Sequence, residues 1–229
     1  MSLIKNELVH ANALLSKLPA SEFQQLEADL ELVSMEHGAV LSDSNSTSYV
    51  YFPTTATVSL QYLLEDGGCP EIAVIGHEGF VADADFFGPH ARAHHAVVQN
   101  GGMGYRIQAH RLQAALNQSN TLMRLVMDCT NRLFYQMAQS IVSSRHQGVF
   151  EQVCRRLLLT LDRVQSDTFD MTHEGLANLL HIRRESVSTA AAQLALQGII
   201  KYKRGHITVL DRAGLEAEAG ECSPSLQYA

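Results

Sequence analysis

The spacing of hydrophobic and polar positions changes twice along the chain. Between residues 3 and 32, apolar side chains recur at intervals of three and four, from Leu14 to Leu30, which predicts short helices. From about 33 to 107, short apolar runs are separated by Gly, Asp, Asn and Pro, a pattern typical of an antiparallel β-roll or barrel. From about 109 the helical spacing returns. The pattern therefore predicts an α+β protein.

The central region predicts several short strands. The clearest hairpin signal is Glu65-Asp-Gly-Gly68, which separates an apolar run ending at Leu64 from the next run, Glu71 to Ile75. The candidate strands are 40–41, 50–52, 57–64, 71–75, 95–99 and 104–107.

Residues 120–143 predict one long helix, because they contain neither Pro nor Gly. A stripe follows alternating steps of three and four, as in a short coiled coil. Its members are Met123, Val126, Thr130, Leu133 and Met137. The stripe could join two copies of the chain or pack on its own domain, and both could hold. A second helix is predicted at roughly 148–164.

The segment from Thr172 to Leu196 predicts two helices joined by a tight turn. Thr172 is a suitable N-cap, and Leu176 and Leu179 supply a buried face. The periodicity breaks at Leu180-His-Ile182. A tight turn between helices commonly needs one residue at positive φ, and we expect His181 to occupy it.

The second of these helices, predicted at about 183–197, has two distinct faces. At about 100° per residue, Val187, Ala190, Ala191 and Leu194 share an apolar side. A separate face near the N-terminus carries Arg184, Glu185, Ser188 and Thr189. An arginine can bond guanine through two hydrogen bonds, and a glutamate can accept from the cytosine amino group. This face is therefore suited to reading base edges.

A basic hairpin is predicted directly after this helix. Gly198 ends the helix, and residues 199–210 form two short strands that turn at Arg204-Gly205. Lys201, Lys203 and Arg204 place positive charge where phosphates would lie. Helix, turn, helix and basic hairpin in this order indicate a winged helix-turn-helix.

The distribution of charge supports this interpretation. The chain has a net charge of −7. Residues 1–145 carry 8 Lys/Arg against 14 Asp/Glu, whereas residues 146–212 carry 9 against 7, and the tail from 213 carries three glutamates. Because phosphate attraction is screened within about 10 Å at ordinary salt, a local basic face can bind DNA in an acidic protein.

These motifs resemble the CRP/FNR family of bacterial transcription regulators. Arg183-Arg-Glu-Ser-Val-Ser-Thr189 resembles the family's recognition helix, and Gly198 to Val209 resembles its wing. Tyr49-Val-Tyr-Phe-Pro53 and Ile75-Gly-His-Glu-Gly-Phe80 resemble its effector-binding roll. The resemblance implies a cyclic-nucleotide-binding-like jelly roll with flanking helices, a long dimerisation helix, and a homodimer that reads a pseudo-palindromic site.

The resemblance also implies roles for individual residues of the DNA-binding domain. Arg184 and Glu185 match the base-reading pair, and Thr172 and Ser186 match phosphate-contacting positions. Thr189 departs from the family, which has a second base-reading Arg there, so a TGTGA-type half-site is not implied. Arg183 could compensate by contacting phosphate. The predicted DNA contacts are Thr172, Arg183, Arg184, Glu185, Ser186, Ser188, Thr189, Lys203 and Arg204.

The sensor region departs further from the cyclic-AMP-binding members. Their Gly-Glu-Leu turn is replaced by Gly76-His-Glu-Gly79, and Arg92-Ala-His-His-Ala96 lacks an Arg followed by a hydroxyl residue. A cyclic phosphate needs a charge-assisted fork and backbone donors. The candidate effector pocket comprises Gly76, His77, Glu78, Gly79, Arg92, His94 and His95, with its ligand unidentified. Since adjacent histidines on a strand point to opposite faces, these histidines do not predict a metal site.

Other classes of protein are disfavoured. The sequence contains no nucleophile elbow, P-loop, HExxH motif or dinucleotide fingerprint, so an enzyme is not predicted. The four cysteines include no Cys-x-x-Cys pair, and no cofactor or metal is expected. No apolar run approaches the length of a membrane span, which predicts a cytoplasmic protein.

The expected organisation is a sensor roll at 1–118, a dimerisation helix at 119–145, the winged helix-turn-helix at 146–213 and a tail at 214–229. The expected partners are double-stranded DNA, a second copy of the chain, a small-molecule effector and, for an activator, RNA polymerase. Two alternatives stay open: a regulator without a ligand, and a ligand-binding scaffold whose helix-turn-helix contacts protein.

Overall fold

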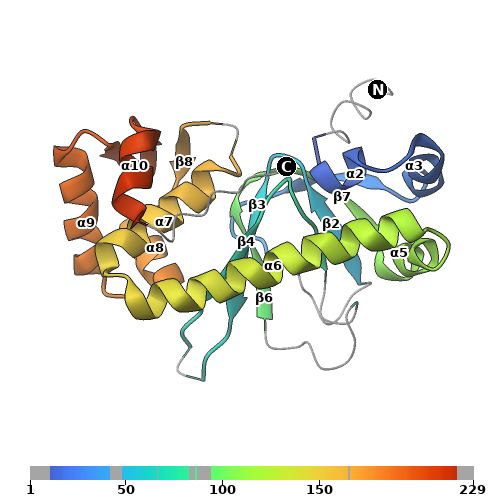
Figure 1. The fold of residues 1–229 in the computed structure, drawn as a ribbon, viewed down its shortest axis with the longest axis horizontal. Coiled ribbons are helices and arrows are strands. Elements are labelled where there is room, and N and C mark those ends of the chain that lie inside the picture. The colour runs from blue at the N-terminus through green and yellow to red at the C-terminus, as the bar shows by residue number, and fades with distance from the viewer. Residues whose placement is uncertain are drawn as a thin grey trace. The chain divides into compact units, whose positions relative to one another are not determined.

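The computed structural model describes residues 11–41, 48–65, 67–82, 86, 94–164 and 166–220 (Figure 1). Internal contacts divide the chain into two compact units. The N-terminal unit contains residues 1–60 and 73–135, and the C-terminal unit contains residues 61–72 and 136–229. Each unit has its own hydrophobic core.

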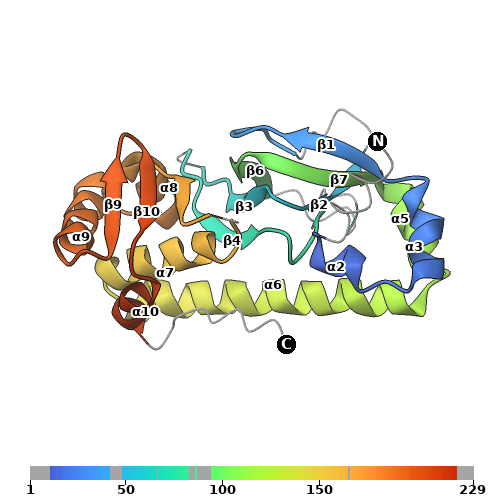
Figure 2. The ribbon, with the colours of Figure 1, turned by 90° about the horizontal axis from the view of Figure 1, so that it is seen from above.

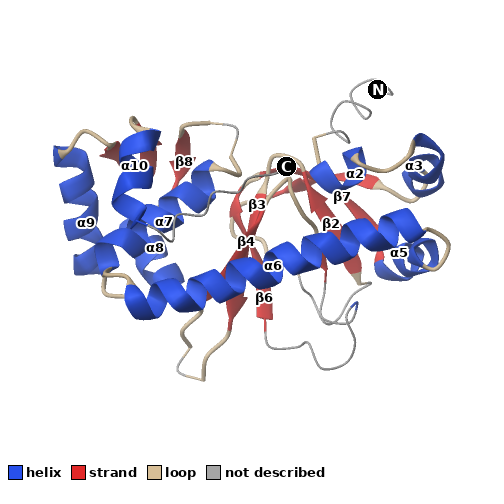
Figure 3. Cartoon of the chain, in the orientation of Figure 1, coloured by secondary structure: helices blue, strands red, loops and turns tan. Residues whose placement is uncertain are grey.

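The N-terminal unit is a roll of two small sheets, whose strands are red in Figure 3. The first sheet has the order β1-β7-β2-β5, with antiparallel pairing throughout. Its strands are β1 (Glu31–Met35), β7 (Gly102–Gln108), β2 (Tyr49–Pro53) and β5 (Val81–Ala82). The second has the order β4-β3-β6. Its strands are β4 (Glu71–Ile75), β3 (Thr57–Tyr62) and β6 (His94–Asn100). Residues 61–62 of β3 and 71–72 of β4 belong to the C-terminal unit. The predicted jelly-roll-like fold is confirmed.

The core of the roll follows the two-residue period of its strands. On β2, Val50 and Phe52 are buried, and each lies opposite a buried residue of β7, Ile107 and Tyr105 respectively. Helices cover this face with further apolar side chains. They are α2 (Ala13–Ser16), α3 (Ala20–Glu27), α5 (Ala109–Leu116) and the first half of α6 (Asn120–His146).

Two predicted segments of the roll need correction. The helical region ends at Glu27 rather than near residue 32, because Glu31–Met35 pairs as strand β1 with β7. That pairing joins residues more than 60 positions apart, which local periodicity cannot register. The strand predicted at Val40 is only an isolated bridge to Val97.

The predicted β3–β4 hairpin is confirmed. The two strands are neighbours in their sheet, and the Leu64 N–H donates to the Gly68 carbonyl at 2.8 Å. Gly67 has φ 84°, a conformation that glycine adopts without strain. Asp66 of the predicted turn lies outside the described residues.

Asn12 holds several backbone segments of the roll together and is fully buried. Its Oδ1 accepts from the Leu14 and Leu15 N–H groups at 3.1 Å, which caps α2. Its Nδ2 donates to the carbonyls of Pro53 at 2.8 Å and Gly79 at 3.0 Å. One side chain therefore satisfies four backbone groups inside the core.

The C-terminal unit has a helical core with a three-stranded sheet of order β8-β10-β9 (Figure 2). Its elements after α6 are α7 (Val149–Leu161), β8 (Thr168–Asp170), α8 (His173–Leu180), α9 (Arg184–Leu196), β9 (Ile200–Lys203), β10 (His206–Val209) and α10 (Arg212–Ala219). The boundary expected at residue 213 falls inside α10. Asp211 caps this helix, and its Leu215 and Ala219 lie in the core.

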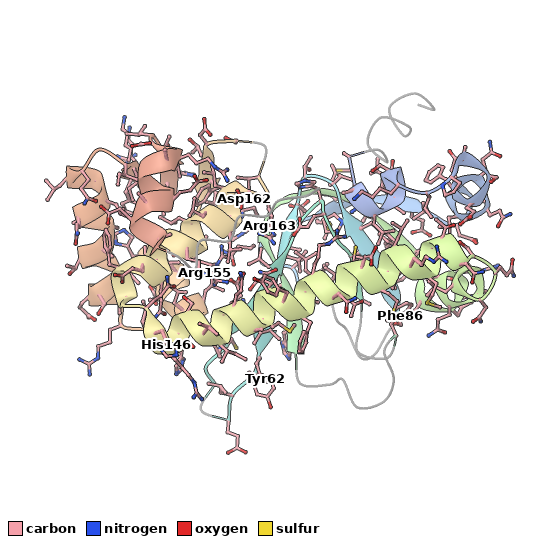
Figure 4. All side chains as sticks on the ribbon, viewed as in Figure 1. Tyr62, Phe86, His146, Arg155, Asp162 and Arg163 are labelled. Carbon is pink, nitrogen blue, oxygen red and sulfur yellow. The ribbon has the colours of Figure 1, made fainter. Side chains whose placement is uncertain are left out.

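Three arginines are buried in the C-terminal unit, Arg155 and Arg156 on α7 and Arg163 just after its end. Arg155 and Arg163 are labelled in Figure 4. Arg163 is 2% exposed and donates to the Leu159 carbonyl at 2.8 Å. Arg156 forms a buried ion pair with Glu71, whose Oε1 lies 2.6 Å from the arginine Nε. These cations are therefore parts of the internal packing and not of a surface.

We predict that Asn12→Ala destabilises the roll. The variant loses the cap of α2, and the buried carbonyls of Pro53 and Gly79 lose their donor. The free energy of unfolding should therefore fall by about 2–4 kcal/mol. Urea denaturation would measure the loss, with the exposed Ser16→Ala as the matched control that changes stability by less than about 0.5 kcal/mol. Equal stability of the two variants would contradict this role of Asn12.

Candidate DNA-binding site

The N-terminus of α8 is set by Thr172, as predicted. Its Oγ1 accepts from the Gly175 N–H at 2.9 Å, and Glu174 lies in the first turn, where the helix dipole favours an anion. The Thr172 side chain is exposed. Its neighbour Met171 donates its N–H to the Gly205 carbonyl at 2.8 Å, so the cap lies beside the turn between β9 and β10.

The turn between α8 and α9 is made by His181, which has φ 53° and ψ 46°. This left-handed conformation confirms the expectation from the sequence. The following N–H, of Ile182, donates to the Ala177 carbonyl at 3.0 Å, which closes the end of α8. His181 therefore fixes the direction in which α9 leaves α8.

Helix α9 buries one face and exposes the other. Val187, Ala190, Ala191 and Leu194 lie in the core of the C-terminal unit. Arg184 and Glu185 are exposed in its first turn, and Arg183, the N-cap residue, is exposed directly before them. The predicted separation of polar and apolar faces is confirmed.

Two of the α9 hydroxyls predicted to contact DNA, those of Ser188 and Thr189, have internal partners. Thr189 Oγ1 donates to the Glu185 carbonyl at 2.9 Å within the helix. Ser188 Oγ is hydrogen-bonded to Nδ1 of His173 at 3.0 Å. Ser186, like Ser188, is half-buried. The long side chains of Arg184 and Glu185 are thus the main groups that extend from this face.

The hairpin of β9 and β10 has the predicted turn. Arg204 and Gly205 both have positive φ, 50° and 86°, as a type I′ turn requires. Lys201, Lys203 and Arg204 are exposed. The sequence did not reveal the third strand, β8, whose Phe169 packs into the core.

Positive charge in this unit is concentrated more narrowly than the sequence count indicates. Of the nine Lys/Arg between 146 and 212, Arg155, Arg156 and Arg163 are buried. Arg212 bonds Asp162 at 2.5 Å. The remaining five are all exposed and lie at the start of α9 or on the hairpin. They are Arg183, Arg184, Lys201, Lys203 and Arg204.

Sequence reasoning missed His173, the first residue of α8. Its ring stacks on Tyr202 of β9, with centroids 4.1 Å apart and planes inclined by 26°. Its Nδ1 bonds Ser188 of α9. Burial, and secondly the charge of Arg184, lower the pKa of His173 below its usual value. The ring therefore connects both helices and the hairpin in its neutral form.

The candidate effector residues 76–79 form a tight turn whose backbone is already bonded. The Gly76 N–H donates to the carboxylate of Glu78 at 3.1 Å. The His77 carbonyl accepts from the Ala13 N–H at 2.7 Å, and the Glu78 carbonyl accepts from Cys129 Sγ at 3.6 Å. This turn thus joins α2 and α6 within the roll.

The other candidate effector residues are less fully placed. Arg92 lies outside the described residues, and His94 belongs to β6 without a described side chain. His95 of β6 is half-buried. Within the described ranges, no group of three or more His, Cys, Asp or Glu could hold a metal ion. No helix in that part of the chain has the length and apolarity of a membrane span.

Helix α6 has an apolar face that the roll leaves uncovered. In the predicted seam, Val126 is only 6% exposed and packs in the roll, whereas Met123 is exposed. The other three members are half-buried: Thr130, Leu133 and Met137. The exposed apolar side chains also include Met127, Phe134 and Ile141, seven residues apart. Phe134 is 72% exposed.

Comparison with known proteins confirms the resemblance. Residues 151–218 match the family model of the Crp-like helix-turn-helix domain. A CRP/FNR transcriptional regulator from Eubacterium rectale superimposes with a TM-score of 0.70 at 15% identity, covering 92% of this chain and 99% of its own. A CRP-family regulator from Thermus thermophilus gives 0.68 at 18% identity, covering 83% and 98%.

A third solved structure is the c-di-GMP responsive regulator CLP of Xanthomonas campestris. Its TM-score is 0.62 at 13% identity, covering 83% of this chain and 99% of its own. No curated protein sequence matches the chain. The chain therefore carries a Crp-like helix-turn-helix on the fold of CRP/FNR transcription regulators.

We predict that His181→Gly stabilises the C-terminal unit. Glycine adopts positive φ without the steric cost that a Cβ brings, so the free energy of unfolding should rise by about 0.5–1 kcal/mol. Thermal and urea unfolding would measure the change. His181→Val is the matched test, because a β-branched residue at this φ should destabilise the unit. A valine variant as stable as the glycine variant would contradict the geometry of this turn.

Proposed function

We propose that this protein, which carries a Crp-like helix-turn-helix domain on the fold of the CRP/FNR regulators, is a homodimeric regulator that reads a pseudo-palindromic DNA site. The observation that carries the proposal is the pairing of an exposed polar face on α9 with a basic hairpin beside the α8 cap. Such a face presents base-reading side chains and phosphate-binding side chains together.

The side chains of this face divide into two groups by their chemistry. Arg184 and Glu185, at the N-terminal end of α9, read base edges in the major groove, a guanine and a cytosine respectively. Thr172, Arg183, Ser186, Lys203 and Arg204 contact phosphates, which orient the domain on the duplex. The three cations in this second group, Arg183, Lys203 and Arg204, are all exposed, which supports this role.

Thr189 alters the expected base contacts. Its hydroxyl is bonded to the Glu185 carbonyl of its own helix, and its side chain is much shorter than an arginine. It therefore does not supply the second guanine contact that an arginine would make. We expect a half-site that differs from the TGTGA type at the base facing Thr189.

We propose that the apolar face of α6 joins two copies of the chain. Met127, Phe134 and Ile141 fall at one heptad position, and Met123, Thr130 and Met137 fall at another, which is the spacing of a coiled-coil seam. This seam is displaced by one residue from the stripe containing Val126, which the roll itself buries. A two-fold dimer places two α9 helices against successive major grooves.

We propose that the roll senses a small molecule. This molecule is not cyclic AMP held by the family's usual motif. The Glu78 carboxylate accepts from the N–H of Gly76 in its own turn, so it is already engaged inside the protein. Because the 76–79 turn is bonded to both α2 and α6, a ligand that reshaped it would act on the helix that carries the dimer seam. CLP, with a similar fold, responds to c-di-GMP.

We predict that Phe134→Glu converts the dimer to monomers. A charge on this uncharged, mostly apolar seam faces its symmetry mate and must be desolvated, so self-association should weaken at least about 100-fold. Sedimentation equilibrium would measure it. Asp128→Ala, on an exposed part of α6 away from the seam, is the matched control and should remain dimeric. A dimer unaffected by Phe134→Glu would rule out this seam.

We predict that Arg184→Ala and Glu185→Ala lose sequence-specific binding while the dimer persists. Selection of bound sequences from random DNA, with and without cell metabolites, first supplies the duplex. Fluorescence anisotropy should then show losses of about 10- to 100-fold for each variant, since one base contact contributes about 1–3 kcal/mol of discrimination.

The wild-type affinity should also fall steeply with salt. For each neutralised phosphate, the logarithm of the association constant should fall by about 0.9 for every tenfold rise in salt concentration. Lys203→Ala is the matched comparison: it should lower affinity for all duplexes alike and reduce this slope by about one. If the wild-type protein selects no sequence, or both α9 variants bind as it does, this assignment of the site fails.

A further inference from the structure

We propose that His173 is a positioning residue for base reading: it orients the Ser188 hydroxyl of the recognition helix while its ring is held against Tyr202 of the hairpin. This inference rests on the proposed DNA-binding function and deepens it. It assigns to Ser188 a specific hydrogen-bonding role that depends on a residue outside the recognition helix.

The position of the ring supports a role in the reading surface. His173 follows the α8 cap, Thr172, directly in sequence. It bonds Ser188 at 3.0 Å, on the half of α9 that carries Arg184 and Glu185, and it stacks on Tyr202, which precedes Lys203. One imidazole thus touches α9 and β9, the two elements that carry the base-reading and hairpin cations.

The chemistry of the ring is poorly explained by packing alone. Nε2 of His173 is enclosed, and it makes no hydrogen bond to any residue that the structure describes. A buried polar atom without a partner costs about 1–3 kcal/mol, which an apolar ring of similar shape would avoid. Retaining a histidine here at this cost is typical of a residue that serves function more than stability.

The two ring nitrogens indicate where the proton lies. A buried N–H without an acceptor is rarer and costlier than an unused lone pair, so the proton is placed on Nδ1 rather than on the enclosed Nε2. Nδ1–H then donates to Ser188 Oγ. The burial of the ring, and secondly the charge of Arg184, lower the pKa of His173 and keep it neutral near pH 7.

This arrangement determines what Ser188 can offer to DNA. Since its oxygen accepts from His173, the hydroxyl proton stays free to be donated to an acceptor on a base edge, such as guanine O6 or N7, adenine N7 or thymine O4. Without His173 the hydroxyl would rotate among several partners. His173 therefore converts a short, rotatable side chain into a directed donor.

The test compares affinity for the selected duplex with affinity for a mixed-sequence duplex of equal length, measured by anisotropy at constant salt. His173→Phe keeps a ring against Tyr202 and removes the bond to Ser188, and Ser188→Ala removes the same bond from the other side. Each should lower the specificity ratio about five- to tenfold, as expected for one hydrogen bond. The double variant should lower it no further.

His173→Asn supplies a rescue, because the asparagine amide can replace Nδ1; its ratio should lie between those of the wild type and His173→Phe. His206→Phe, at a hairpin histidine bonded to Asp170 at 2.5 Å, is the matched control and should leave the ratio unchanged. A purely structural role would weaken both duplexes equally and would leave the ratio as it is.

The outcomes separate this inference from the proposed function. A wild-type protein that selects no sequence overturns both. If the wild-type protein selects a sequence through Arg184 but His173→Phe and Ser188→Ala keep its specificity ratio, only the role of His173 is overturned. Independent, additive losses in the double variant, or no rescue by asparagine, would overturn it as well. Should His173→Phe not fold, Ser188→Ala still decides.

Discussion

The burial of one face of α9 is the constraint on which the reading surface depends. Val187, Ala190, Ala191 and Leu194 must leave water together, and at helical spacing this turns Arg184 and Glu185 outward. Small alanines let the neighbouring helices approach closely, so the helix has little freedom to rotate. His181, in its left-handed conformation, sets the angle at which α9 begins. The outward direction of Arg184 and Glu185 is thus a consequence of core packing.

Charge acts on this surface locally. The chain as a whole is acidic, and the buried Arg156 and Arg163 are bonded internally, so they add nothing to an attractive surface. The exposed cations of α9 and the hairpin form a small basic area within a negative protein. Screening confines its influence to about 10 Å, so binding depends on direct contacts more than on long-range attraction. On this surface the His173–Ser188 hydrogen bond is one of the fixed contacts.

In the roll, hydrogen bonds to buried backbone groups hold several elements together. Asn12 and the 76–79 turn bond groups from α2, β2 and α6, so a small displacement of the turn cannot remain local. The candidate effector residues of this turn are therefore also structural ones. The residues that stand where the cyclic-AMP motif would be are bonded to their own turn and to the backbone of neighbouring elements.

The sequence by itself determined the features that depend on neighbouring residues. Thr172 as a cap, His181 and Arg204-Gly205 at positive φ, and the two faces of α9 follow from local stereochemistry and helical period. Only the tertiary structure decided β1, β8, the burial of Arg155, Arg156 and Arg163, and which apolar side chains of α6 stay exposed. It also joined His173 to Ser188 and Tyr202. Each of these features depends on a partner distant in sequence. The pattern along the chain records the spacing of apolar and polar residues, but not which surface of the folded protein covers them.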